Sequence, residues 1–255
     1  MLEDIQRANA WKRISAYLFD IIFVFIILVG VAYLTSIITN YDHYTTEFEK
    51  VEAKYEEEYG IDFDITKEIY EGLSPEEAAK YPTDYLDRLE AAGVALGSDK
   101  EAQYYYAMIM SLIVLIFSVS VIVSFAIYEF AIPLFFKNGQ TLGKKIFAIG
   151  VIRTDMVRVT GVEMFTRAML GKCTVELLLP LVMIFSMGMV GTVAAAGISI
   201  LSLCLLVFTK NRTPIHDVLA HTVTVDMSSQ RVFNSVDDLI AYKNKLHAER
   251  ISESQ

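Results

Sequence analysis

The sequence predicts an all-α transmembrane protein: a four-helix membrane bundle with a small cytoplasmic β element and an extracytoplasmic helical insertion. Composition is the first reason, because 54% hydrophobic residues and a mean hydropathy of +0.40 exceed what a soluble domain usually carries. The second reason is that three apolar stretches reach the roughly 20 residues of a helical span: Ile14 to Ile38, Tyr104 to Phe136, and Leu177 to Thr209. An uneven distribution of charge then sets the topology.

The first apolar stretch is expected to be retained as a transmembrane helix. It is longer than the apolar region of a signal peptide and has no small-residue cleavage site. It also contains Asp20, at a depth where an unpaired charge costs about 2.5 kcal/mol or more. We therefore expect Asp20 either to bind a ligand or to hold helices together.

The acidic insertion comprises residues 39–103, between the first two apolar stretches. It holds 18 acidic and 6 basic residues, which leaves 13 acidic and 16 basic residues elsewhere in the chain. The positive-inside rule places clusters of Lys and Arg in the cytoplasm. Such clusters occur at Arg7, Lys12 and Arg13, from Lys137 to Lys172, and from Lys210 onward. The charges thus predict a multi-pass cell-membrane protein with both termini cytoplasmic and the insertion outside.

Two short helices are predicted within the insertion. Ser74 is a suitable N-cap, with Pro75 at the first helical position and acidic residues directly behind it. Thr83 and Asp84 begin a second helix, which Gly93 is expected to end.

The third apolar stretch should cross the membrane twice, because the basic residues Lys172 and Lys210 flank it on the same side. Two short helices that turn near Gly188 and Gly191 would satisfy this requirement. About 17 residues per crossing is the lower limit. A re-entrant hairpin, or a helix that begins earlier near Phe165, therefore stays open as an alternative.

The β element is predicted from alternating residues in two cytoplasmic segments. Ile149, Val151 and Arg153 occupy alternate positions, and a turn near Asp155 leads to a returning strand at 158–160, so a short hairpin is expected. A similar alternation at 222–225 suggests a small sheet that joins both segments. Beyond it, Ser235 caps a predicted tail helix with apolar residues Val236, Leu239, Ile240 and Leu246.

Polar residues at or near membrane depth form the candidate site. Arg13 and Asp20 are seven residues apart, which is about two helical turns and about 10 Å of rise. They share a face of the first helix, but they are too far apart to touch easily. We expect a cytoplasm-facing polar pocket between them that is completed by Arg212, His216, Asp217 and Glu129.

Three blocks of these residues resemble the RDD family. The first is Arg13-x-x-Ala16-x-x-x-Asp20, the second is residues 139–145 (GQTLGKK), and the third is Ile215-His216-Asp217-x-x-Ala220-x-Thr222. The family is named for an arginine and two aspartates, which correspond to Arg13, Asp20 and Asp217. His221 stands where the family more often has a small residue such as Gly.

The resemblance covers residues 10–36 and about 104–226, and it implies four parts of the chain. Residues 1–38 are the cytoplasmic N-terminus and first transmembrane helix, 39–103 the acidic insertion, 104–226 the remainder of an RDD-like membrane domain, and 227–255 the cytoplasmic tail helix. Some members of this family are linked to cation/proton exchange and others to the regulation of membrane proteases.

Each candidate residue also has a purely structural interpretation. Arg13 would be an interfacial anchor, Asp20 a partner of a basic residue on another helix, and His216 and Asp217 a helix-end or turn feature. Glu129 and Glu176 would be snorkelling or helix-start carboxylates. The block around Lys144 and Lys145 lacks the spacing of a phosphate-binding loop, so nucleotide binding is not expected. Both lysines are instead expected to contact anionic lipid headgroups.

Two functions remain open at this point. The chain is either a cation/proton transporter that uses a buried carboxylate, or a non-catalytic scaffold or regulator that binds another membrane protein through its acidic outer loop. No nucleophile–base pair, zinc spacing or dinucleotide fingerprint is recognisable, so we expect no enzyme, no cofactor, no metal and no nucleic acid. The expected partners are the lipid bilayer, monovalent cations or protons, and a membrane protein or a second copy of this chain.

Overall fold

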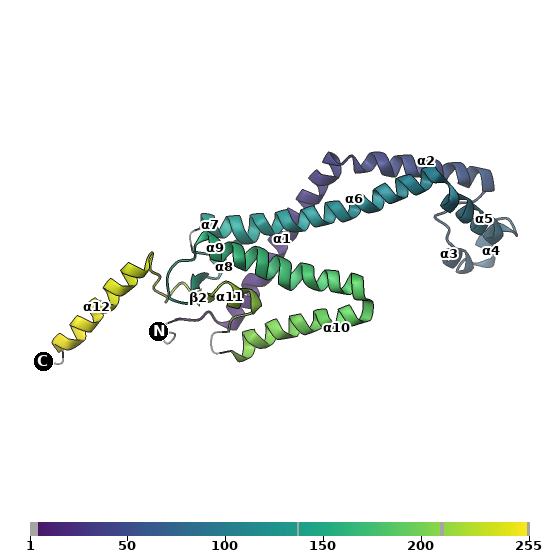
Figure 1. The fold of residues 1–255 in the computed structure, drawn as a ribbon. Coiled ribbons are helices and arrows are strands. Elements are labelled where there is room, and N and C mark those ends of the chain that lie inside the picture. The colour runs from purple at the N-terminus through teal and green to yellow at the C-terminus, as the bar shows by residue number, and fades with distance from the viewer. Residues whose placement is uncertain (1–4, 137, 210–211, 254–255) are drawn as a thin grey trace. The chain divides into compact units, whose positions relative to one another are not determined.

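A computed structural model describes residues 5–136, 138–209 and 212–253, so that Lys137 and Lys210, which contributed to the charge argument, lie outside the described residues. The described chain is mostly helical and contains one two-stranded sheet. It divides into two compact units, Met1–Val29 with Val121–Gln255, and Gly30–Ser120, which are considered separately below (Figure 1).

Three helices in the described chain are long and apolar enough to cross a membrane. The first is α1 (Ala10–Ile38). The second comprises α6 (Lys100–Phe125), the π-helix η2 (Ala126–Ala131) and α7 (Ile132–Phe135), and the third comprises α9 (Gly161–Phe165), the π-helix η3 (Thr166–Leu178) and α10 (Leu179–Phe208). Large apolar side chains such as Phe25, Phe185 and Val193 are exposed on them, as expected where the surrounding solvent is lipid. The predicted membrane character is confirmed.

The third of these helices reverses direction at Gly188, as Figure 1 shows for α10. Gly188 has φ 55° and ψ −125°, a conformation that only glycine adopts readily. Beyond the turn, Gly191 lies so close to the backbone carbonyl of Met183 that a Cβ atom would have no room. The predicted turn is therefore present. The helix starts at Gly161, earlier than the apolar stretch and close to the alternative start near Phe165.

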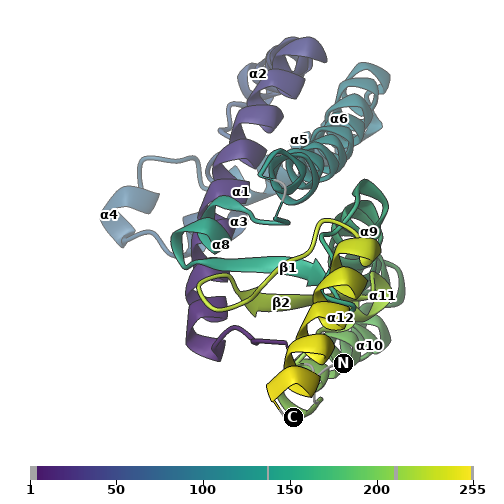
Figure 2. The same ribbon diagram turned by 90° about the vertical axis from the view of Figure 1, so that its left-hand side faces the viewer.

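The sheet joins the two segments that sequence alternation identified. β1 (Ile149–Arg153) pairs antiparallel with β2 (Thr222–Asp226), with Val151 opposite Thr224. Figure 2 shows the strands side by side. The predicted sheet is thus confirmed, whereas the hairpin expected within 149–160 is reduced to a single bridge between Ile152 and Arg158. Each strand follows a five-residue helix, α8 (Leu142–Ile146) or α11 (Ile215–Leu219).

A small hydrophobic core lies beside the sheet and anchors the tail helix, α12 (Val236–Glu253). Its buried members are Ile5, Ile152, Met156, Val223, Val225 and Leu239. The backbone N–H of Asp238 donates to the Ser235 hydroxyl at 3.1 Å, which is the cap that the sequence suggested. Leu239 ties the tail helix to the strands, because it is the buried residue through which α12 enters this core.

The unit Gly30–Ser120 contains the acidic insertion. Its helices are α2 (Tyr41–Tyr59), α3 (Lys67–Glu71), α4 (Pro75–Ala78) and α5 (Tyr85–Ser98). Ser74 caps α4 with a reciprocal bond pattern involving Glu77, as its sequence indicated. Gly93 does not end α5, which runs on to Ser98. A glycine inside a helix costs only about 1 kcal/mol, and the alanines around it sustain the helix. α2 was not predicted.

Candidate functional site

Asp20 is buried on α1 and accepts hydrogen bonds from three donors. The Tyr128 hydroxyl lies 2.7 Å from Oδ1, the Thr141 hydroxyl 2.7 Å from Oδ2, and the backbone N–H of Gly143 3.0 Å from Oδ1. Gly143 permits this approach, because a Cβ atom there would lie 2.6 Å from Asp20 Oδ1 and closer still to the carbonyl of Ala16. The carboxylate is therefore held in one orientation by η2 and by the start of α8.

Lys144 lies between two carboxylates. Its Nζ is 3.7 Å from Asp20 Oδ2 and 3.8 Å from Glu129 Oε2, and it donates a long hydrogen bond of 3.3 Å to the Thr141 hydroxyl. Glu129 Oε1 instead accepts a 2.6 Å hydrogen bond from Lys172. Lys144 was expected at lipid headgroups, but it is buried, because α8 folds back onto α1 and η2.

Burial lowers the pKa of Lys144 to about 8. The carboxylate of Glu129 opposes this shift, the charges of Lys172 and Arg167 add to it, and Asp20 opposes it more weakly. Its neighbour Lys145 is exposed, with its ammonium 4.0 Å from the centre of the Phe136 ring. The two consecutive lysines thus have opposite environments.

Asp217 is fully buried at the centre of a second charged cluster. Its Oδ1 accepts from Arg167 Nε at 2.6 Å and from the Thr222 hydroxyl at 2.9 Å, and Arg13 Nη2 lies 3.6 Å from its Oδ2. Burial alone would raise the pKa of Asp217. The charges of Arg167 and Arg13, together with the hydrogen bond from Arg167, outweigh that effect and hold this pKa well below its usual range.

His216 connects the cluster around Asp217 to the third apolar helix, through η3 and α10. Its Nδ1 lies 2.8 Å from Glu176 Oε2, and its Nε2 lies 3.4 Å from Arg167 Nη2. Glu176 Oε1 also accepts a 2.8 Å hydrogen bond from Ser202 on the returning arm of α10. Since Arg167 can only donate, the contacts fit a neutral imidazole with its proton on Nδ1. Burial lowers the pKa of His216, consistent with that form.

The predicted pocket residues thus lie in two clusters. Asp20 and Glu129 meet around Lys144, whereas Arg13 and His216 meet, together with Arg167, around Asp217. Arg212 differs from the expectation. Its side chain is exposed, and its backbone carbonyl accepts a 2.7 Å hydrogen bond from Arg13. Glu176 is not a simple snorkelling carboxylate, because it pairs with His216.

The sequence reasoning missed two basic residues of the clusters, Arg167 and Lys172. The third apolar stretch begins at Leu177, and the alternative start near Phe165 assigned neither residue to the site, whereas both lie in the 13-residue π-helix η3. Residues 163, 167, 172 and 176 are all charged, with spacings of four, five and four. This period exceeds that of an α-helix and approaches the i→i+5 pattern of a π-helix. The charge spacing was therefore a usable signal.

Two short helix–strand units of the same design hold the central charges. Lys144 is the third residue of α8 and Asp217 the third residue of α11. In both units the residue before the strand has a positive φ, 53° at Ala148 and 51° at His221. Helix α1 supplies a charge of opposite sign to each of these helix–strand pairs: Asp20 pairs with Lys144 of α8, and Arg13 pairs with Asp217 of α11.

Chemically, the two clusters offer buried charges of both signs in balance. Asp20 and Glu129 face Lys144 and Lys172, and Asp217 and Glu176 face Arg13 and Arg167. In the part of the chain that the structure describes, no group of three His, Cys, Asp or Glu side chains could hold a metal ion.

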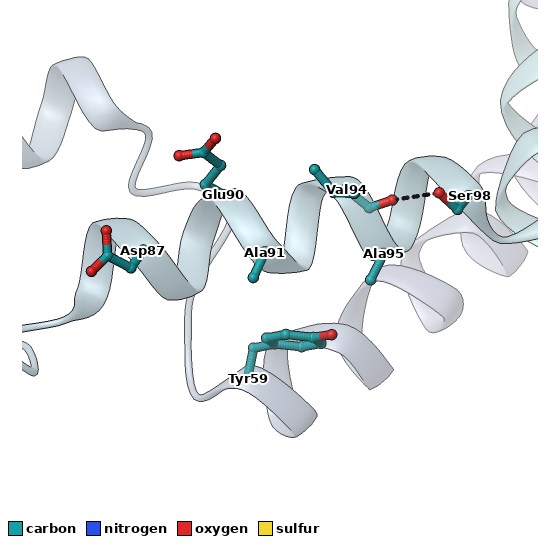
Figure 3. A pocket seen from close by; sticks show the side chains of 7 residues that line it. All are labelled: Tyr59, Asp87, Glu90, Ala91, Val94, Ala95 and Ser98. Atoms are coloured by element: carbon teal, nitrogen blue, oxygen red, sulfur yellow. Dashed lines mark hydrogen bonds between the residues drawn. The ribbon is translucent and has the colours of Figure 1, made fainter.

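A separate groove of about 580 Å³ lies on the unit Gly30–Ser120, between α5 and the end of α2 (Figure 3). Tyr59 lies under it, and Asp87 and Glu90 stand along α5 beside small apolar residues. Its polar side chains are acidic or neutral. The groove shares no residue with the charged clusters.

The profile of the RDD family matches residues 7–221. The chain belongs to the RDD family. The match includes α1, both π-helices, α8, β1 and α11, and so nearly all of the charged clusters. No characterised protein and no solved structure matches the chain.

Within this RDD domain, His221 occupies a backbone conformation that favours glycine. Its φ of 51° lies in the left-handed region, which glycine occupies without a steric penalty. A glycine at this position would therefore relieve a strain that this chain retains. The turn leads directly into Thr222, which bonds Asp217 at 2.9 Å.

Proposed function

We propose that this RDD protein exchanges a monovalent cation for a proton across the membrane, and that Lys144 carries the proton. The observation behind this proposal is the position of the Lys144 ammonium, 3.7 Å from Asp20 and 3.8 Å from Glu129, with one long hydrogen bond to Thr141. The three donors around Asp20 are already matched to a carboxylate. Lys144 is therefore a better candidate for proton release than the buried carboxylate that sequence alone suggested.

The charges around Lys144 set the stoichiometry of this exchange. With Lys144 protonated, the two carboxylates Asp20 and Glu129 balance the ammonium groups of Lys144 and Lys172. When Lys144 releases its proton, the group carries one net negative charge. A single monovalent cation that replaces the proton restores neutrality. Exchange by this route is therefore electroneutral, one cation for one proton, and includes no catalytic step.

We further propose four membrane crossings with both termini in the cytoplasm. Helix α1 and the helix Lys100–Phe135 supply two, and the arms of the hairpin before and after Gly188 supply the others. The acidic residues 39–103 then face outward by the positive-inside rule. Under this topology Lys144 lies near the cytoplasmic side, where it can exchange protons with the cell interior.

Reconstitution of the full chain into proteoliposomes with a trapped pH-sensitive dye tests the proposal. Addition of Na⁺, K⁺ or Li⁺ should move protons in the wild type without generating a membrane potential. Lys144→Arg keeps a permanent charge and should reduce this flux by about tenfold or more, whereas the exposed neighbour variant Lys145→Arg is the matched control. Circular dichroism melting establishes that each variant is folded. Unchanged flux in folded Lys144→Arg would refute the proposal.

A second candidate function is that of a scaffold or regulator which binds another membrane protein. Its support is the unit Gly30–Ser120, which has a core of its own around Ile61, Tyr85 and Ala92. That unit also carries the acidic groove with Asp87 and Glu90. A basic surface on a partner would complement it. Absence of cation-dependent flux, together with a partner whose co-purification requires Asp87 and Glu90, would favour this function over exchange.

A further inference from the structure

A second groove lies where the tail helix α12 meets the sheet core, and it has a volume of about 410 Å³. Leu239, Leu246 and Phe233 supply apolar surface to it. The segment before α12 is fixed to the core, because the backbone N–H of Phe233 donates to Met156 at 3.1 Å and the N–H of Arg158 donates to Phe233 at 2.9 Å. The walls of this groove are therefore held by regular contacts.

Arg231 and Lys243 supply the charges that line this groove, both positive, and His247 lines it as well. No carboxylate lines it, although the whole chain carries a net charge of −9. Arg231 is placed with its guanidinium 4.4 Å from the centre of the Tyr242 ring. Within the described residues, neither Arg231 nor Lys243 forms an ion pair with a carboxylate. Both cations are thus available to a ligand.

We propose that this groove binds a small organic anion, a carboxylate or phosphate carried on a compact apolar body. The basic side chains would receive the anionic group, and Phe233, Leu239 and Leu246 would receive the apolar part. The volume is within the range of small-molecule sites, and it is too small for a helix of a partner protein with its side chains. Charge complementarity and size therefore point to the same class of ligand.

The groove belongs to the part of the chain that is additional to the family domain. Its lining residues from Ser229 to His247 follow the matched range 7–221. Leu239 and Met156, however, also belong to the core that contains Val223 and Val225 of β2. An anion bound here would therefore lie in a groove built mainly by the tail, and the tail packs directly against the RDD domain.

The test uses the full chain in lipid nanodiscs and fluorine NMR. The probes are para-trifluoromethylbenzoate, para-trifluoromethylphenyl phosphate and the neutral para-trifluoromethylbenzamide, with empty nanodiscs as the background. At least one anionic probe should bind, and the neutral amide should bind at least about fivefold more weakly, since a charge-assisted contact contributes that much. The stronger of the two anions identifies the preferred head group.

Variants assign the binding to the groove. Arg231→Gln and Lys243→Gln should each weaken the bound anion by about fivefold or more. Lys245→Gln is the matched control, because Lys245 lies on the same helix, is well exposed and does not line the groove. The inference is overturned if neither anion binds, if the amide binds equally well, or if both groove variants behave as Lys245→Gln does.

Discussion

The lowered pKa of Lys144 makes a quantitative prediction about stability in alkali. In the unfolded chain this ammonium titrates near 10.5, and in the folded protein its pKa is about 8. Between these values the unfolded chain holds more protons, so the free energy of unfolding rises with pH. A difference of about 2.5 pKa units corresponds to a gain of about 3 kcal/mol when the pH has passed 10.5.

This gain in the free energy of unfolding should be absent in variants whose residue 144 does not titrate between pH 8 and 10.5. Lys144→Arg keeps its charge throughout, and Lys144→Met never carries one, so both should lack the rise that the wild type shows. Lys145→Arg should retain it, because Lys145 is exposed. The measurement is unfolding by sodium dodecyl sulfate in mixed micelles, followed by circular dichroism between pH 7 and 10.5. If the wild type and Lys144→Arg have the same slope, the buried position of Lys144 does not control its ionisation.

Three other predictions test the packing and charge of the clusters by the same unfolding measurement, with Gly30→Ala as the comparison for one of them. Asp217→Asn should destabilise the protein by about 3–5 kcal/mol, because Arg167 is left as an uncompensated buried charge; a loss below about 1 kcal/mol would contradict this. Gly143→Ala should lower stability by more than about 2 kcal/mol, because the new methyl group would meet the Asp20 carboxylate at 2.6 Å. Gly30→Ala, which has open space around it on α1, should instead be neutral or should stabilise the protein by up to about 1 kcal/mol. Equal effects of the two alanine substitutions would be inconsistent with the close approach of Gly143 to Asp20. His221→Gly should raise stability by about 1 kcal/mol by removing a strained φ of 51°, and a loss of stability would show that the imidazole matters more than the backbone.

Local and compositional features could be predicted from the sequence. Apolar stretches predicted the membrane helices, because a span requires a minimum length of uncharged chain. Alternating residues predicted the pairing of 149–153 with 222–226, and the Ser74 cap was recognisable because its partners lie within three residues. The three family blocks identified Arg13, Asp20 and Asp217 as residues of interest by their spacing and order along the chain.

Long-range pairing was decided by the tertiary structure. The partner of Asp20 is Lys144, 124 positions later in the chain, and the sequence predicts a headgroup contact for it because nothing in its own segment requires burial. Arg167 and Lys172 reach the clusters only through a π-helix, whose wider period changes which residues share a face. At Arg212 it is the backbone carbonyl that bonds Arg13, since proximity in sequence does not determine which atom faces the site.

The sequence by itself therefore determined that this chain is an RDD membrane protein with charged residues in and beside its apolar helices. It could do so because hydropathy and charge balance are properties of short segments. The tertiary structure alone decided that Arg13 and Asp20 pair with Asp217 and Lys144 in two separate clusters. The physical reason is that a buried charge is neutralised by whichever opposite charge the packing of distant helices brings within a few ångströms.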